Sequence, residues 1–179
     1  WLEGPWPASP TGMIDKFMSF GQPEAARRYL DRFLARGGVA ANQDLSESYF
    51  LVGSELALQK KFQEAMGTLA QAIKLNPAKT RARLQLATLL FRFQQFAEAV
   101  PHLRMVVAEQ PLVHNTRKML ALALSQSGDY ANAVRHLEYL SSLDSKDAMA
   151  KQIEQAAARA AAQAVQQAMA AKGQAAQFR

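Results

Sequence analysis

Apolar side chains recur at steps of three and four residues through most of the chain, with polar side chains between them. This spacing places the apolar side chains on one face of an α-helix. Pro77 and Pro111 mark helix ends, because proline cannot continue a helix. Asp44 or Ser46 is suited to cap the helix that follows them. The pattern predicts helices near residues 46–59, 62–75, 80–93, 96–110, 114–127 and 130–142.

The predicted helices form pairs, because one pattern is written three times between residues 46 and 145 without a gap. The matching positions are Tyr49, Val52, Gly53, Leu56, Phe62, Ala65, Leu69, Ala72 and Pro77; then Arg83, Leu86, Ala87, Leu90, Phe96, Ala99, Leu103, Val106 and Pro111; then Arg117, Leu120, Ala121, Leu124, Tyr130, Ala133, Leu137, Leu140 and Ser145. The small residues suit helices that cross closely. A 34-residue period with these residues resembles the tetratricopeptide repeat (TPR) family. The resemblance implies an all-α fold, a right-handed α-solenoid of antiparallel helix pairs.

The segments outside the repeats differ from them in composition. Proline and glycine are frequent near the N-terminus, and Pro23 suits the first position of a helix. The predicted organisation is an extended arm at 1–12, a divergent helical hairpin at 13–37, a linker at 38–45, three TPR repeats at 46–79, 80–113 and 114–147, and an alanine- and glutamine-rich capping helix and tail at 146–179.

The C-terminal segment has no glycine or proline from 147 to 172, so a helix is expected to continue to Gly173. A narrow apolar stripe able to cap the last repeat is formed by Met149, Ile153, Ala157 and Ala160. The continuation through Val165 and Met169 is longer than one cap requires. It either projects into solvent or contacts a partner.

Charge and composition narrow the partners. The formal net charge is +6, but no block of like charges or interleaving of aromatic with basic residues occurs, so nucleic acid is an unlikely partner and acidic protein segments are favoured. No apolar run is long enough to span a membrane. Trp1 and Trp6 are expected either to pack on the domain or to lie near a membrane or partner. The chain begins at Trp1, which weakly favours an exported or membrane-anchored protein over a cytoplasmic one.

Catalytic chemistry is not predicted. The chain has no cysteine, no glycine-rich phosphate loop and no His-Glu-x-x-His pair. His102 and His136 occupy the same place in successive repeats, and Glu98 shares a helix face with His102, but no further ligand completes a metal site. The two histidines are expected to be surface or groove-edge residues. We therefore expect no enzyme activity, no cofactor and no metal.

The TPR resemblance implies a binding surface instead. First helices of TPR repeats line a concave groove that holds an extended or helical peptide. The positions that correspond are Phe50, Ser54, Arg81, Leu84, Gln85, Thr88, Phe91, Arg92, Asn115, Lys118, Met119 and Leu122. Such a mixed wall favours a partner segment with hydrophobic anchors flanked by acidic residues. Leu84 and Leu122 either line this groove or extend the core.

Three functions are compatible with these features. The first is a bacterial adaptor or assembly factor that holds a partner in the groove. The second is a structural subunit of a complex that docks through its N-terminal arm and C-terminal helix. The third is a secretion-type TPR chaperone, although such chaperones are typically acidic and this chain has a pI near 9.8. A clamp for chaperone carboxylate tails is not expected. TPR domains with that clamp use lysine, arginine and asparagine side chains, and the matching positions here are Phe50, Ser54, Gln85, Asn115 and Met119, none of which is a cation.

Overall fold

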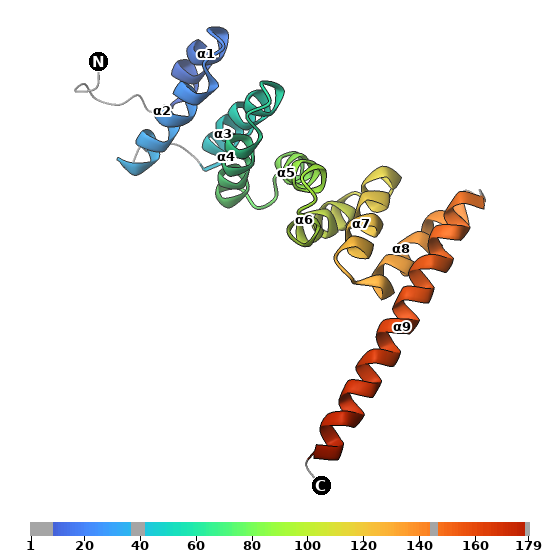
Figure 1. Cartoon of the computed structure of the whole chain (residues 1–179). Coiled ribbons are helices and arrows are strands. Elements are labelled where there is room, and N and C mark those ends of the chain that lie inside the picture. Colours follow the sequence, from blue (N-terminus) through green and yellow to red (C-terminus); the bar gives the residue numbers. More distant parts are fainter. Residues whose placement is uncertain (1–8, 37–41, 144–146, 178–179) are drawn as a thin grey trace. The chain divides into compact units, whose positions relative to one another are not determined.

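The computed structural model describes residues 9–36, 42–143 and 147–177, and all regular secondary structure in these ranges is helical (Figure 1). The predicted all-α fold of TPR-type helix pairs is confirmed. The helices are α1 (Thr11–Ser19), α2 (Pro23–Ala35), α3 (Asn42–Leu58), α4 (Phe62–Leu75), α5 (Thr80–Arg92), α6 (Phe96–Glu109), α7 (His114–Gln126), α8 (Tyr130–Leu143) and α9 (Asp147–Gln177). None of these helices is both long and apolar enough to cross a lipid bilayer.

The chain divides into two compact units, residues 1–93 and 94–179. The division falls inside the second predicted repeat, 80–113, and leaves α5 in unit 1 and α6 in unit 2. The predicted domain boundaries themselves stay a prediction.

In unit 1, α2 packs on α3, α3 on α4 and α4 on α5, and their buried apolar side chains form the core of the unit. Gly53 of α3 lies against Leu69 of α4, and both are buried. A Cβ atom on Gly53 would lie 2.9 Å from Leu69 Cγ. The absence of a side chain at Gly53 therefore lets α3 and α4 approach closely, as the small residues of the pattern predicted. The largest fully buried side chains of this core include Phe33, Leu45, Tyr49, Leu56 and Leu69.

The helix turns share one geometry. Lys60 (φ 62°), Gln94 (φ 61°) and Gly128 (φ 88°) occupy the same position in successive repeats, and all three adopt left-handed backbone conformations. The backbone N–H of Lys61, the residue that follows Lys60, donates to Leu56 O at 2.9 Å. This bond closes the helix end by satisfying a carbonyl that has no partner within the helix. Gly21 (φ 64°) adopts the same left-handed conformation in the turn between α1 and α2. These two helices pack on each other as a hairpin, as the helices of each repeat do.

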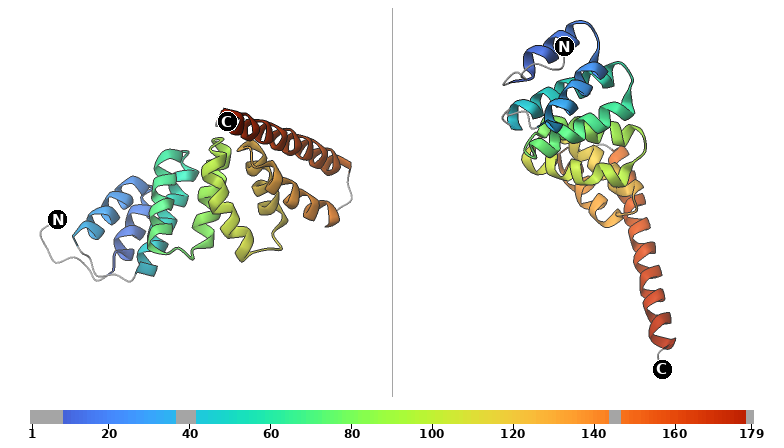
Figure 2. Two further views of the ribbon diagram at one scale, coloured as in Figure 1. Left: turned by 90° about the horizontal axis from the view of Figure 1, so that it is seen from below. Right: turned by 90° about the vertical axis from the view of Figure 1, so that its left-hand side faces the viewer.

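Unit 2 is closed by the first half of α9. Ala156 of α9 is 3% exposed and packs with Ala121 of α7 and Leu137 of α8. The apolar stripe is therefore shifted from the prediction, because Ala156 is buried and Ala157 is exposed. The right-hand view of Figure 2 shows the second half of α9 projecting as a bare helix, and Val165 there is 53% exposed.

Some further sequence predictions need correction, and others lie outside the described residues. α3 begins at Asn42, so Asp44 and Ser46 lie inside the helix and the end of the predicted linker 38–45 is helical. Ser46 is buried and donates to Ala72 O at 2.9 Å, which is a tertiary contact and not a cap. α1 begins at Thr11, inside the predicted arm, and α9 passes Gly173 to end at Gln177. Trp1, Trp6 and the side chain of Met149 lie outside the described residues.

Candidate functional site

The exposed side of α5 carries the predicted site positions of the second repeat. α5 buries Ala82, Arg83, Leu86, Ala87, Leu89 and Leu90. The positions between them remain at least partly accessible, at intervals that keep them on one side of the helix. We call the first four of these positions, Arg81, Leu84, Gln85 and Thr88, the α5 strip. Thr88 is exposed and its hydroxyl donates to Leu84 O at 2.8 Å, so the hydroxyl proton is satisfied within α5 itself.

The α5 strip is joined to α3 by polar contacts. Ser54 Oγ of α3 lies 2.7 Å from Gln85 Oε1 and 2.8 Å from Phe50 O. The hydroxyl has one proton, so it donates to one of these oxygens at a time. The Ser54–Gln85 contact therefore brings the surfaces of α3 and α5 next to each other.

Phe50 does not form an open socket for a partner. Its side chain is 6% exposed, and the Arg81 guanidinium and the Lys79 ammonium lie 4.9 and 5.4 Å from its ring centroid. Lys79 also pairs with Glu47. Arg81 remains exposed and has no carboxylate partner among the described residues. The ring of Phe50 therefore packs against two cations. Lys79 is neutralised by Glu47, so Arg81 supplies the positive charge that a partner can reach.

Arg92 was expected to line the groove, but its guanidinium packs on α4. It lies 4.7 Å from the ring centroid of Phe62, the first residue of α4. Phe91, the neighbouring predicted residue, is half-buried. Arg92 therefore lies close to the helix turns at one edge of unit 1.

The predicted residues of the third repeat lie on α7 in unit 2. Asn115 and Lys118 are exposed, whereas Met119 and Leu122 are half-buried. Each occupies the repeat position of one residue of the α5 strip, and all four remain at least partly accessible on their own helix. Leu84 and Leu122 are both half-buried, so each contributes to packing and to the surface. A single groove formed by all three repeats stays a prediction.

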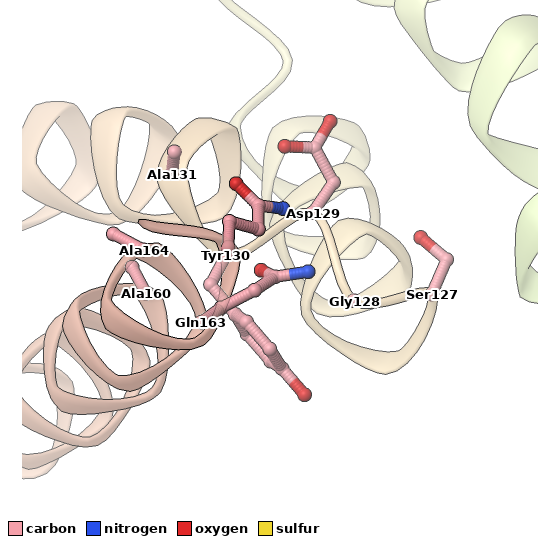
Figure 3. Close-up of a pocket in the computed structure, with 9 residues that line it drawn as sticks. Ser127, Gly128, Asp129, Tyr130, Ala131, Ala160, Gln163 and Ala164 are labelled. Carbon is pink, nitrogen blue, oxygen red and sulfur yellow. The ribbon is translucent and has the colours of Figure 1, made fainter. Parts of the chain in front are cut away.

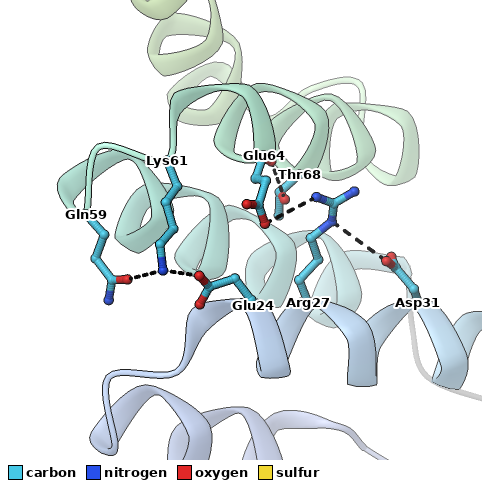
Figure 4. Close-up of polar contacts among 7 residues, drawn as sticks. All are labelled: Glu24, Arg27, Asp31, Gln59, Lys61, Glu64 and Thr68. Carbon is cyan, nitrogen blue, oxygen red and sulfur yellow. Dashed lines mark hydrogen bonds and ion pairs between the residues drawn. The ribbon is translucent and has the colours of Figure 1, made fainter.

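Ion pairs link α2 to the start of α4 in unit 1 (Figure 4). Lys61 pairs with Glu24, and the hydrogen bond from Lys61 holds the pKa of Glu24 below its usual value. Arg27 lies 3.7 Å from Asp31 and 4.0 Å from Glu64. These contacts fix α2 on the start of α4. In the described residues no group of three histidine, aspartate or glutamate side chains is placed to hold a metal.

The two histidines singled out from the sequence are half-buried. His136 Nδ1 lies 3.5 Å from Arg117 Nη1. Burial lowers the pKa of His136 from its usual value, and the charges of Arg117 and Arg104 lower it further. A neutral imidazole beside an arginine is a packing arrangement, and within the described part of the chain no carboxylate pairs with His136 as an acid–base partner.

A pocket that the sequence did not predict lies between the α7–α8 turn and α9 (Figure 3). Its volume is about 460 Å³, and it is lined by Ser127, Gly128, Asp129, Tyr130, Ala131, Ala160, Gln163, Ala164 and Gln167. Asp129 is already engaged, since Arg104 Nη2 donates to it at 3.1 Å. The pocket exists because α9 continues past the body of unit 2, which the length of the alanine-rich segment could have suggested.

Comparison with known proteins identifies the type of fold. Residues 56–123 match the family model described as Tetratricopeptide repeat. No curated protein resembles the chain closely enough to count as a match. Among solved structures, "MamA 41-end from Desulfovibrio magneticus RS-1" is 22% identical with a TM-score of 0.57, covering 84% of this chain and 88% of that one. The "MamA RS-1 ArsTM double mutant" is 21% identical with a TM-score of 0.59, covering 84% and 82%.

A third similar structure is YrrB, described as "a TPR protein with an unusual peptide-binding site". It is 17% identical to this chain with a TM-score of 0.57, covering 75% of this chain and 67% of that one. Identities this low establish the fold alone.

Proposed function

We propose that this chain, which carries tetratricopeptide repeats, is a non-enzymatic adaptor that binds a segment of a partner protein on the α5 strip and the adjoining surface of α3. TPR repeats are generally interaction modules without enzyme activity, and their fold suggests protein partners. YrrB, with a similar fold, is described as having a peptide-binding site. That description supports a peptide as the class of ligand.

The observation that carries the proposal is Arg81, which packs on the buried ring of Phe50 and has no carboxylate partner in the described part of the chain. The guanidinium is held 4.9 Å from the ring centroid, which limits its freedom before a partner arrives. A guanidinium in this position suits a carboxylate, to which it can donate two parallel hydrogen bonds. Leu84, half-buried one turn further along α5, adds an apolar contact. The partner segment is therefore acidic with an apolar side chain nearby.

The experiment is an affinity purification from the native source with three forms of the full chain. Arg81→Glu reverses the charge on the strip. It should fold well, because an acidic residue in the first turn of α5 interacts favourably with the helix dipole. The matched control is Lys74→Glu, which makes the same charge change at an exposed position of α4.

A partner that is retained by the wild type and by Lys74→Glu but lost from Arg81→Glu supports the proposal. The proposal is wrong if every partner persists with Arg81→Glu, or if partners are lost equally with both variants.

A second function is favoured by one observation on α9. Residues 161–167 are exposed on every side of the helix, and Met169 is 68% exposed. A structural subunit that docks in a larger complex through this helix would explain a segment that unit 2 does not need for its core. Removing residues 161–179 should then abolish association while Arg81→Glu leaves it intact. The reverse result would favour the adaptor.

A further inference from the structure

Unit 1 exposes large apolar side chains at its helix turns. Phe20 follows α1 and is 76% exposed, Leu58 ends α3 and is 77% exposed, and Phe93 follows α5 and is 46% exposed. The first two turns touch, because Gln59 Nε2 donates to Gly21 O at 3.4 Å. Exposed side chains of this size in one region are typical of interaction sites.

The repeats themselves show that the fold does not require these residues. The position of Phe93 is taken by Gln59 in the preceding repeat and by Ser127 in the following one, and each closes its first helix. The position of Leu58 is taken by Gln126 two repeats later. Polar residues therefore suffice for this turn, and the apolar ones of unit 1 need another explanation.

One of these side chains, Phe93, packs on Phe62, the first residue of α4, and Leu58 lies four residues before Phe62 in the chain. The rings of Phe62 and Phe93 have centroids 5.3 Å apart at an interplanar angle of 58°. The Arg92 guanidinium lies 4.7 Å from the centroid of Phe62. Leu58 and the exposed Lys60 come from the turn that leads into Phe62. We call these five residues the turn-edge patch.

The patch carries positive charge without compensation. Lys60 and Arg92 have no carboxylate partner among the described residues. The carboxylates of the adjacent helix turns are already engaged, since Glu24 pairs with Lys61, Glu64 lies 4.0 Å from Arg27, and Glu55 accepts from Gln59 at 3.2 Å. A ligand that covers the patch must therefore bring negative charge as well as apolar surface.

We propose that the turn-edge patch is a second docking site, which binds a protein segment containing a leucine or aromatic side chain flanked by aspartate or glutamate. The apolar side chain packs on Phe93 and Leu58, and the carboxylates meet Arg92 and Lys60. Arg92 is suited to this role because its stacking on Phe62 holds the planar guanidinium in place while leaving its donors accessible. An anionic lipid surface is less suited, since lipid-binding sites use clusters of about four to eight basic residues and the patch has two unpaired ones.

The test uses selection of peptides from a displayed random library on the full chain. The key variant is Leu58→Gln with Phe93→Ser, which introduces the residues that the same positions carry at 126 and 127. These substitutions should leave the fold intact, and circular dichroism and thermal unfolding check this. Arg81→Glu is the control that alters the α5 strip alone. Binding of selected peptides is measured for each form, together with binding to phosphatidylserine–phosphatidylcholine vesicles.

The expected result is a set of peptides enriched in acidic residues around a leucine or aromatic residue. Their affinity should fall at least about tenfold with the double variant and stay unchanged with Arg81→Glu. Peptides that are lost with Arg81→Glu but not with the double variant would overturn this inference and support the α5 strip. Failure to select any peptide that depends on Leu58 and Phe93 would overturn it too, and vesicle binding that depends on them would assign the patch to lipid.

Discussion

Adding one methyl group at Gly53 tests how closely α3 and α4 pack. The Cβ atom of Gly53→Ala would lie 2.9 Å from Leu69 Cγ, 3.1 Å from Leu69 Cδ2 and 3.3 Å from the Leu69 backbone nitrogen. Leu69 is fully buried, so its side chain cannot swing into solvent, and its backbone nitrogen is fixed in α4. The two helices must therefore move apart to accept the methyl group.

The expected loss follows from two opposing effects. Overpacking a well-packed core costs about 1–3 kcal/mol. Replacing glycine by alanine inside a helix returns about 1 kcal/mol. Gly53→Ala should therefore lower the free energy of unfolding by about 1 kcal/mol.

Gly67→Ala is the matched control, because it lies in α4 of the same unit and is exposed. The nearest atom to its Cβ would be Arg27 Nη2 at 4.0 Å. Only the helix-propensity effect remains, so this variant should gain up to about 1 kcal/mol. Urea unfolding of the full chain, followed by far-ultraviolet circular dichroism, measures both. If Gly53→Ala proves as stable as Gly67→Ala, the close approach of α3 and α4 does not limit the packing.

A double-mutant cycle identifies the side chain responsible. Leu69→Ala alone should cost about 2–5 kcal/mol because it leaves a cavity. Combined with Gly53→Ala, the added methyl group enters that cavity and its own penalty disappears. A coupling energy of more than about 0.5 kcal/mol is expected. Simple additivity would refute the contact as the cause.

Three other predictions concern single positions. Lys60→Gly should raise the free energy of unfolding by about 1 kcal/mol, because the φ of 62° at Lys60 favours glycine. Gly128→Ala should lower it, because Gly128 has a φ of 88°. If urea unfolding shows the same change in stability for both variants, this reasoning is wrong. Phe50→Ala should cost about 3 kcal/mol, since the ring is 6% exposed, and a loss below about 1 kcal/mol would show that the ring is a surface residue. The lowered pKa of His136 means that the unfolded chain binds its proton more readily, so its contribution to stability is present above the ordinary pKa and is lost as pH falls through the lower, folded value. Acidification from about pH 7 to about pH 5 should therefore destabilise the wild type more than His136→Gln, and parallel pH profiles of unfolding would refute this.

The repeat helices could be predicted closely from the sequence. α4 was predicted at its observed bounds, and the ends of α5 to α8 differ by at most one residue. Regular spacing of apolar residues and the prolines at the helix ends carry this information. The start of α3 was missed because Ser46 looked like a cap, while its hydroxyl instead contacts Ala72 of α4. A hydrogen bond between helices has no signal in the local sequence.

The sequence could indicate which positions of α5 are accessible, but not what their side chains contact. The TPR resemblance implied that Arg81 and Thr88 are groove positions, and both are exposed on α5. Where a long side chain ends depends on the neighbouring helix, so the sequence could not show that Arg92 packs on Phe62. Nor could it show that Phe50 lies beneath Arg81. A pattern of alternating buried and accessible positions gives the face of a helix, and only the packed neighbours decide which atoms a partner can reach.

The helices of each unit pack chiefly on those next to them in the chain, such as α3 on α4 and α7 on α8. Contacts between residues close in sequence require little loop closure before they form. Proteins dominated by such contacts fold within about microseconds to milliseconds. The two helices of a hairpin can thus pack together soon after both have left the ribosome. In a nascent chain α3 and α4 can be buried against each other before the C-terminal helices have been synthesised.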